Sequence, residues 1–262
     1  MGALLRSEWR KVTTTKMLWV LVLVAIVYSC VQTVTLTLVA SGLLPGVPAQ
    51  DELLLDPQYI TTLLAQTGTA ATFVLILGII AMTGEFRHMT ITSTFLAAPR
   101  RWPVLLAKVL LYGALGAVIA AVTMGFVLVA AAVSLIPFEH APITAGAIAS
   151  VLAGAVIGMA LYAILGVSLG SLITNQVAAI VTALVWMLLV EALVGLAFPG
   201  VSTWLPGGAL SSAMDVAVRA DVTGGMTQAD RLPPWGGIAV LLAYAVVLGA
   251  IASRTMLRRD IT

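Results

Sequence analysis

Six long apolar runs divide this chain, and most of its charged residues lie between them. Only 9% of the 262 residues are charged, 61% are hydrophobic, and the mean hydropathy is +1.10. A water-soluble domain carries a charged share of roughly 25%, so the sequence indicates a protein whose solvent is lipid. A transmembrane helix needs about 20 apolar residues. The runs predict six membrane spans, over residues 17–40, 62–83, 104–136, 144–173, 177–198 and 236–256.

The lysines and arginines fall mainly on one side of these spans. Eleven of the thirteen lie before the first span, near the loop between the second and third, or after the sixth. The alternate loops hold seven acidic residues but only Arg219 and Arg231 as cations. Basic loops are held in the cytoplasm when helices insert. We therefore expect an all-α integral membrane protein, a single transmembrane domain over residues 1–262, with both termini in the cytoplasm.

The segment before the first span, residues 1–16, predicts a short amphipathic helix. Its apolar stripe follows from the i, i+4, i+7 spacing of Leu5, Trp9 and Val12. Its other face carries Arg6, Arg10 and Lys11. Such a helix lies in the membrane interface, with its cations toward anionic lipid. The alternative is a basic flank that only orients the first span. That span exceeds the 7–15 residues of a signal-peptide core, so we expect it to be retained.

Polar side chains mark the first two spans. They are Ser29, Gln32, Thr33 and Thr37 in the first span and Thr62, Gln66 and Thr69 in the second. Hydroxyls and amides in lipid usually hydrogen-bond a neighbouring helix or their own backbone. The alternative is that they line a route for a partly polar substrate, and the sequence leaves both interpretations open.

Glu191 is the only acidic residue well inside a predicted span. It lies fourteen residues after Val177, which is roughly 21 Å along a helix. A carboxylate within the membrane is costly and is a functional candidate by default. A protonated glutamate bound to a neighbouring helix explains it equally well.

Two further patterns concern packing. The fourth span contains Gly154-x-x-x-Gly158 and Gly166-x-x-x-Gly170, a spacing that lets helix backbones approach closely. Residues 199–235 form the longest predicted outer segment, in which residues 204–210 predict a turn and a short helix. Its mixture of apolar residues and turn formers predicts a re-entrant segment, which is tolerated only where protein surrounds it.

The sequence offers no site for ATP or a metal ion. A Walker A loop needs Lys followed by Ser or Thr, but the three lysines precede Val12, Met17 and Val109. Two histidines in loops on opposite sides and one cysteine cannot complete a zinc site. We expect no enzyme activity, no bound cofactor and no nucleic-acid partner. Energised transport would then depend on another subunit.

The predicted cytoplasmic loop, residues 84–103, carries the most specific pattern. A short helix over residues 90–97 would be stopped by Pro99, because the residue before proline disfavours helix. Phe95 and Leu96 would form an apolar knob on it that fits a cleft in a soluble partner. An interfacial helix lying on lipid is the alternative.

In order and spacing, Glu85, Arg87, Thr90, Pro99, Arg101 and Lys108 resemble the permease subunit of type 2 ABC transporters, which have the ABCG-like exporter fold. Many members of that family have Gly before the Thr, where this chain has Met89. The segments 4–11 and 257–262 resemble actinobacterial members. The resemblance therefore implies a multi-pass protein of the bacterial inner (plasma) membrane.

The resemblance implies a half-transporter. Two such chains, as a homodimer or heterodimer, would form the pathway, and two ATPase subunits that bind ATP and Mg²⁺ would dock beneath them. The residues implied in ATPase coupling are Glu85, Arg87, Thr90, Phe95, Leu96, Pro99 and Arg101. The family's pathway lies at the dimer interface, along spans one, two and five. Those spans hold Glu191 and the polar residues of the first two spans named above.

Two other functions compete with an exporter permease. A secondary carrier or channel would need coupling-ion residues or a polar pore, and a single intramembrane carboxylate supports it weakly. A membrane scaffold or sensor subunit would not transport at all. The modest outer loops favour a small amphiphile, drug or lipid as the substrate of an exporter.

Overall fold

The computed structural model describes residues 2–44, 48–87, 101–216, 218–220, 226–228 and 231–258. Six helices within these ranges are long and apolar enough to cross a membrane. They are Lys16–Ala40, Pro57–Arg87, Leu105–Leu135, Ala145–Leu172, Gln176–Ala197 and Pro234–Arg254. The structure thus has six membrane-length apolar helices, as the sequence predicts, and the chain is a multi-pass membrane protein. Many large apolar side chains point outward, among them Leu23, Val129 and Leu188, as expected of helices whose solvent is lipid.

Some of these spans are single helices and others are interrupted. The first, third, fourth and sixth are α2 (Lys16–Ala40), α7 (Arg101–Leu135), α8 (Ala145–Leu172) and α13 (Pro234–Arg258). The second consists of α4 (Pro57–Leu64), η1 (Ala65–Ala70) and α5 (Ala71–Arg87). The fifth consists of α9 (Gln176–Val185), η2 (Trp186–Val190) and α10 (Glu191–Ala197).

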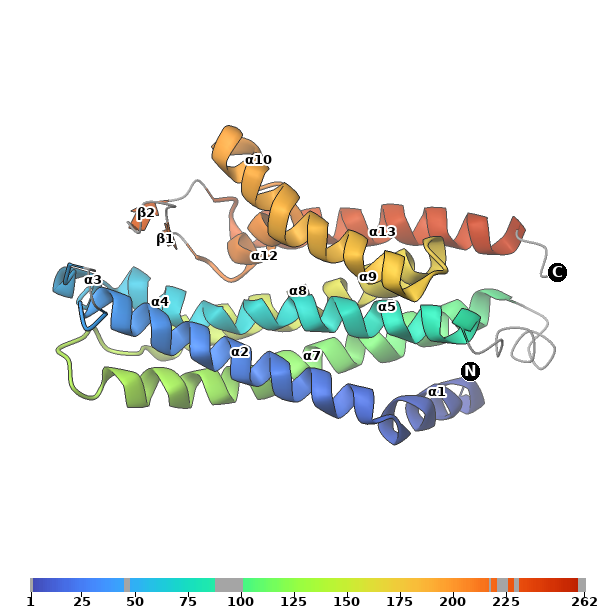
Figure 1. Cartoon of the computed structure of the whole chain (residues 1–262), viewed down its shortest axis with the longest axis horizontal. Coiled ribbons are helices and arrows are strands. Elements are labelled where there is room, and N and C mark those ends of the chain that lie inside the picture. The colour runs from blue at the N-terminus through green and yellow to red at the C-terminus, as the bar shows by residue number, and fades with distance from the viewer. Residues whose placement is uncertain are drawn as a thin grey trace.

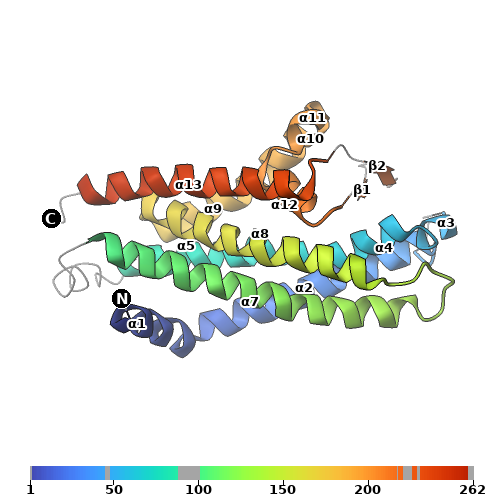
Figure 2. The same ribbon diagram turned by 180° about the vertical axis from the view of Figure 1, so that it is seen from behind.

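Shorter elements lie at the two ends of the bundle. They are α1 (Gly2–Thr14), α3 (Asp51–Leu54), α11 (Pro199–Ser202), α12 (Pro206–Ala213), β1 (Val218–Ala220) and β2 (Met226–Gln228). The two strands pair antiparallel as one small hairpin, and all the other described elements are helices, as predicted. Figures 1 and 2 show α1, the end of α5, the start of α7 and the end of α13 at one end of the bundle. The hairpin, α3 and α12 lie toward the other end.

Helix α8 is the central element and packs along α5, α7 and α13 (Figures 1 and 2). Its contact with α5 depends on glycine. A Cβ at Gly166 would collide with the carbonyl oxygen of Leu75, and one at Gly170 would lie 2.7 Å from that of Ile79. The close approach predicted from the spacing Gly166-x-x-x-Gly170 is therefore confirmed.

The short helix α12 packs against α8 and α13 at similarly close range. A Cβ at Gly154 of α8 would collide with the carbonyl of Ala213, and one at Gly237 of α13 with that of Ala209. Most α12 side chains are buried. The turn and short helix predicted over residues 204–210 thus correspond to α12, which protein surrounds on at least two sides.

Two spans depart from regular α-helix. In the second, the hydroxyls of Thr67 and Thr69 donate to the carbonyls of Leu64 and Gln66, three residues back, across the 3₁₀ segment η1. Side-chain bonds of this kind offer the backbone an alternative to the α-helix. In the fifth, η2 is a π-helix that ends immediately before Glu191. Such interruptions in a helix often occur at functional sites.

Candidate functional site

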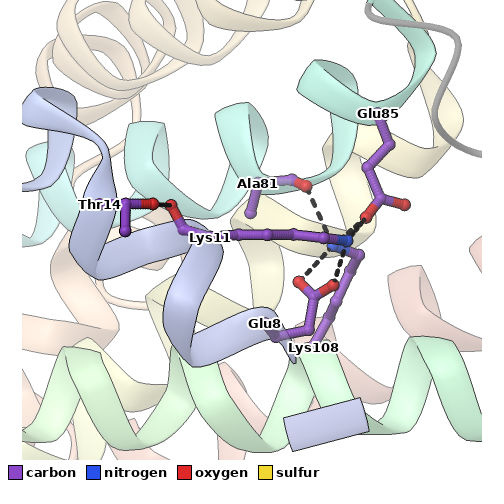
Figure 3. A network of polar contacts seen from close by, with 6 residues as sticks. All are labelled: Glu8, Lys11, Thr14, Ala81, Glu85 and Lys108. Carbon is purple, nitrogen blue, oxygen red and sulfur yellow. Dashed lines mark hydrogen bonds and ion pairs between the residues drawn. The ribbon is translucent and has the colours of Figure 1, made fainter. Parts of the chain in front are cut away.

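Four charged side chains meet where α1, α5 and α7 come together (Figure 3). Glu8 and Lys11 come from α1, Glu85 from the last turn of α5, and Lys108 from the start of α7. We call these four residues the charge cluster. They alternate in sign, so their formal charges cancel.

The ion pairs of the charge cluster are short. Lys108 Nζ lies 2.6 Å from Glu8 Oε2 and 2.9 Å from Glu85 Oε1. Lys11 Nζ lies 2.7 Å from Glu8 Oε1 and 2.8 Å from Glu85 Oε1. Lys108 also donates to the carbonyl of Ala81 at 3.3 Å. Each glutamate therefore pairs with both lysines, and the three helices are tied by direct ionic contacts.

Burial makes these pairs interdependent. Lys108 is 1% exposed, Glu8 4% and Glu85 6%, whereas the Lys11 side chain retains 43% of its exposure. Taking such charges out of water costs several kcal/mol per ion, and only close pairing with opposite charges offsets this desolvation penalty. Removal of one member would therefore leave a buried charge without its full set of partners.

Lys11 lies outside the spans and stays charged. Burial lowers its pKa, but hydrogen bonds and charge interactions with Glu8 and Glu85 outweigh this, and the pKa rises above its ordinary value of 10.5. The stability that Lys11 contributes is thus fully present below pH 10.5 and is lost only as the pH rises through the higher folded-state pKa.

The sequence assigned part of this cluster differently. Lys11 was expected beside Arg6 and Arg10 on a lipid-facing cationic surface, but its ammonium group points to Glu8 and Glu85. Arg6 and Arg10 are exposed. Glu8 was not singled out, although its i, i+3 spacing to Lys11 is a recognisable pairing signal. The helix itself is present as α1.

The predicted coupling residues divide into three groups. Glu85 is a buried member of the charge cluster. Arg87 is exposed, and its Nη1 donates to Gln176 Oε1 at 3.4 Å, at the start of α9. Arg101 begins α7. The predicted helix over residues 90–97 and the candidates Thr90, Phe95, Leu96 and Pro99 lie outside the described residues.

Three of the polar residues in the first span bond within the chain. Ser29, Thr33 and Thr37 are fully buried. Ser29 Oγ lies 2.9 Å from Thr69 Oγ1, and Thr37 Oγ1 lies 3.2 Å from Ser134 Oγ of α7. Thr33 donates to the Ser29 carbonyl of its own helix at 2.9 Å. These hydroxyls link α2 to its neighbours in the same chain.

The other polar candidates border a cavity of about 410 Å³. Gln32, Thr62, Gln66 and Thr69 line it from α2, α4 and η1. The opposite wall includes Gly207, Gly208 and Ser211 of α12 and Met187 of η2. We call this space the polar cavity. Its volume lies in the range of small-molecule pockets.

Glu191 lies beside the polar cavity and binds its wall. The backbone N–H of Gly207, in the first turn of α12, donates to Glu191 Oε2 at 2.9 Å. Leu205, the N-cap residue of α12, provides no side-chain cap. The carboxyl group of Glu191 thus satisfies one of the free N–H groups of that helix end. A bulkier residue than Gly207 would collide with it.

Neither the charge cluster nor the surroundings of Glu191 resemble a metal centre. Within the part of the chain that the structure describes, no group of three or more His, Cys, Asp or Glu residues could hold a metal ion.

A scan against models of known protein families finds none that matches this chain, and a comparison with curated proteins finds no match.

Substitutions of Glu191 separate a capping role from a charge role. Glu191→Gln should keep an acceptor for the Gly207 N–H and lower the stability in detergent by less than about 0.5 kcal/mol, whereas Glu191→Leu should cost about 1–2 kcal/mol, the usual range for a lost cap. Thermal unfolding of the purified variants measures both. If Glu191→Leu is as stable as the wild type, the contact with α12 is incidental. If Glu191→Gln is as unstable as Glu191→Leu, the ionised carboxylate is required.

Proposed function

We propose that the chain is the transmembrane permease subunit of an ATP-driven ABC exporter. Two such chains would enclose the pathway in the bacterial plasma membrane, and two separate ATPase subunits would supply the energy. The charge cluster is the observation that carries this proposal. The segment 84–103, whose residues resemble the permease coupling loop, begins and ends beside it.

The charge cluster supports a mechanical role for that loop. Glu85 lies at the end of α5, and Lys108 lies within the first turns of α7. Their ion pair, 2.9 Å from Lys108 Nζ to Glu85 Oε1, therefore joins the two helices that flank the loop. Glu8 and Lys11 add α1 to the same unit. A displacement applied between residues 87 and 101 would therefore move three helix ends together.

The second span offers a route from the cluster to the polar cavity. It runs from Arg87 back to Pro57 with one interruption at η1. Residues Gln66 and Thr69 of η1 border the polar cavity. A shift of α5 along its contact with α8 would thus reach η1, where a 3₁₀ segment can adjust more readily than a regular α-helix. Coupling over such distances requires a physical element that both sites bias.

The distribution of charge supports the expected orientation. Most basic residues lie on α1, at the ends of α5 and α13 and at the starts of α2 and α7, and these parts lie at one end of the bundle (Figure 1). Arg219 and Arg231 are the exceptions among the described residues. By the positive-inside rule this end faces the cytoplasm, where the ATPase subunits would dock. The interfacial position of α1 and the re-entrant position of α12 are part of the same proposal.

Recovery of a partner ATPase tests the function. We expect the chain, isolated from native membranes under mild conditions, to bring with it a protein that carries a Walker A loop, and the chain alone to hydrolyse no ATP. Phe95→Ala and Leu96→Ala should each weaken that association about 10- to 100-fold, because one buried side chain of this size contributes about 1.5–3 kcal/mol. Binding of the purified ATPase to the chain in nanodiscs gives the affinities.

Phe126→Ala is the matched control, since Phe126 is an exposed phenylalanine of α7. It should bind the ATPase as the wild type does. Unchanged affinity in both loop variants would reject the docking role of the loop. ATP hydrolysis by the chain alone, or transport in vesicles without any ATPase, would favour a self-contained carrier over a permease subunit.

A further inference from the structure

A second cavity lies next to the polar cavity and differs from it in chemistry. It has a volume of about 280 Å³ and is lined almost wholly by apolar side chains, including Leu75, Leu165, Leu169, Trp186 and Leu248. These come from α5, α8, η2 and α13. We call it the apolar cavity. Tyr162 and Met187 line both cavities, so the two spaces share a wall of two side chains.

The polar cavity presents hydrogen-bonding groups without net charge. Its lining contains the amides of Gln32 and Gln66 and the hydroxyls of several serines and threonines. Of the described residues that line it, only Arg231 is charged, and its guanidinium is paired with the Asp215 carboxylate. The chemistry favours an uncharged head group that bears hydroxyls or amides.

Tyr162 is the residue that joins the two cavities. It comes from the middle of α8 and is 1% exposed. Its hydroxyl is buried, and no described residue hydrogen-bonds to it. A buried hydroxyl without a partner costs free energy, so such groups in native proteins usually have a ligand, an ion or a water molecule as their partner.

We propose that the two cavities form one site for a single-chain amphiphile. The uncharged head would occupy the polar cavity, the chain would occupy the apolar cavity, and the Tyr162 hydroxyl would bind the head where the two meet. The inference deepens the proposed function, because it names the substrate class of the exporter, and as a substrate site it rests on that function. Binding itself requires neither ATP nor an ATPase.

A photoreactive amphiphile tests the site in the purified full chain in lipid nanodiscs. The probe is monooctanoylglycerol with a diazirine at the end of its chain, and labelled peptides are identified by mass spectrometry. We expect saturable labelling of α8 near Leu165 and Leu169 and of η2 near Trp186. Excess unlabelled monooctanoylglycerol should abolish it, whereas octanoate, which has the same chain with an anionic head, should not.

Tyr162→Phe is the decisive variant. It should raise the half-saturating probe concentration about 2- to 10-fold, which is the loss of affinity expected when one neutral hydrogen bond is removed. It should also melt at the same temperature as the wild type or higher, because it removes an unpartnered buried hydroxyl. If the Tyr162 hydroxyl binds only water, the half-saturating probe concentration should be the same in this variant as in the wild type.

Tyr59→Phe is the matched control. Tyr59 is equally buried, but its hydroxyl donates to the Leu36 carbonyl at 2.7 Å, and it lines neither cavity. This variant should melt at a lower temperature and bind the probe as the wild type does.

Several results would overturn the proposal. They are labelling that does not saturate, competition by octanoate as strong as by monooctanoylglycerol, and unchanged probe affinity in Tyr162→Phe. Failure to find an ATPase would instead reject the exporter function and leave the binding result intact. The two experiments therefore fail independently.

Discussion

Replacing Lys108 with methionine should destabilise the chain by about 3–5 kcal/mol, the cost of removing one partner from a buried ion pair. Lys108 is 1% exposed and contacts both glutamates of the charge cluster, at 2.6 and 2.9 Å. Methionine keeps most of the volume but leaves Glu8 and Glu85 with Lys11 alone. The free energy of unfolding in mixed detergent micelles measures the loss.

The matched control is Arg10→Met, which removes an exposed cation from α1. It should change the stability by less than about 0.5 kcal/mol, as most surface substitutions do. A second substitution should also rescue the first. Lys108→Met combined with Glu8→Gln leaves one pair, Lys11 with Glu85, and should be more stable than Lys108→Met alone. Equal stability of Lys108→Met and Arg10→Met would show that the cluster does not hold the three helices together.

The spans were predictable because hydropathy reports burial in lipid directly. The first span was expected at residues 17–40, and α2 covers Lys16–Ala40. The second was expected at 62–83, but the helix runs from Pro57 to Arg87. Asp56 caps its start, accepting from the N–H of Gln58 at 2.9 Å, and proline occupies the first helical position. Both signals are local, but a hydropathy window does not register them.

The charge cluster could be predicted only in part, because its pairs are distant in sequence. Lys108 and Glu8 are separated by 100 positions, and no local pattern links them. The i, i+3 spacing of Glu8 to Lys11 indicates a pair within one helix, but it does not indicate a contact with α7. The resemblance drew attention to Glu85 and Lys108 but gave no reason to expect that they bind each other.

The polar residues of the first two spans illustrate a different limit. Helical spacing places Ser29, Thr33 and Thr37 on one face, but it does not say what that face meets. The structure buries these three between helices, whereas Gln32, one residue before Thr33, borders the polar cavity. The sequence does not single out Tyr162, because one tyrosine in an apolar run forms no pattern with its neighbours. Its importance depends on the absence of a partner among the described residues, which only the packing reveals.

Replacing Gly166 with leucine should cost about 3 kcal/mol or prevent folding, because it inserts a side chain where two helix backbones meet. Even the first atom of that side chain would collide with the carbonyl oxygen of Leu75 and would lie 3.0 Å from the Cα of Gly78. Neither group can move without separating α5 from α8. Since α5 joins the charge cluster to η1, that separation should also disturb the polar cavity.

Gly125→Leu provides the control for Gly166→Leu. Gly125 lies in the third span, is exposed, and has no neighbouring atom within 4 Å of an added Cβ. The same substitution there replaces a weak helix former by a strong one and should be neutral or slightly stabilising. The comparison isolates helix packing from helix propensity and from the hydrophobicity of leucine. Equal yields and equal melting temperatures for the two variants would mean that α5 and α8 do not pack as closely as their glycines require.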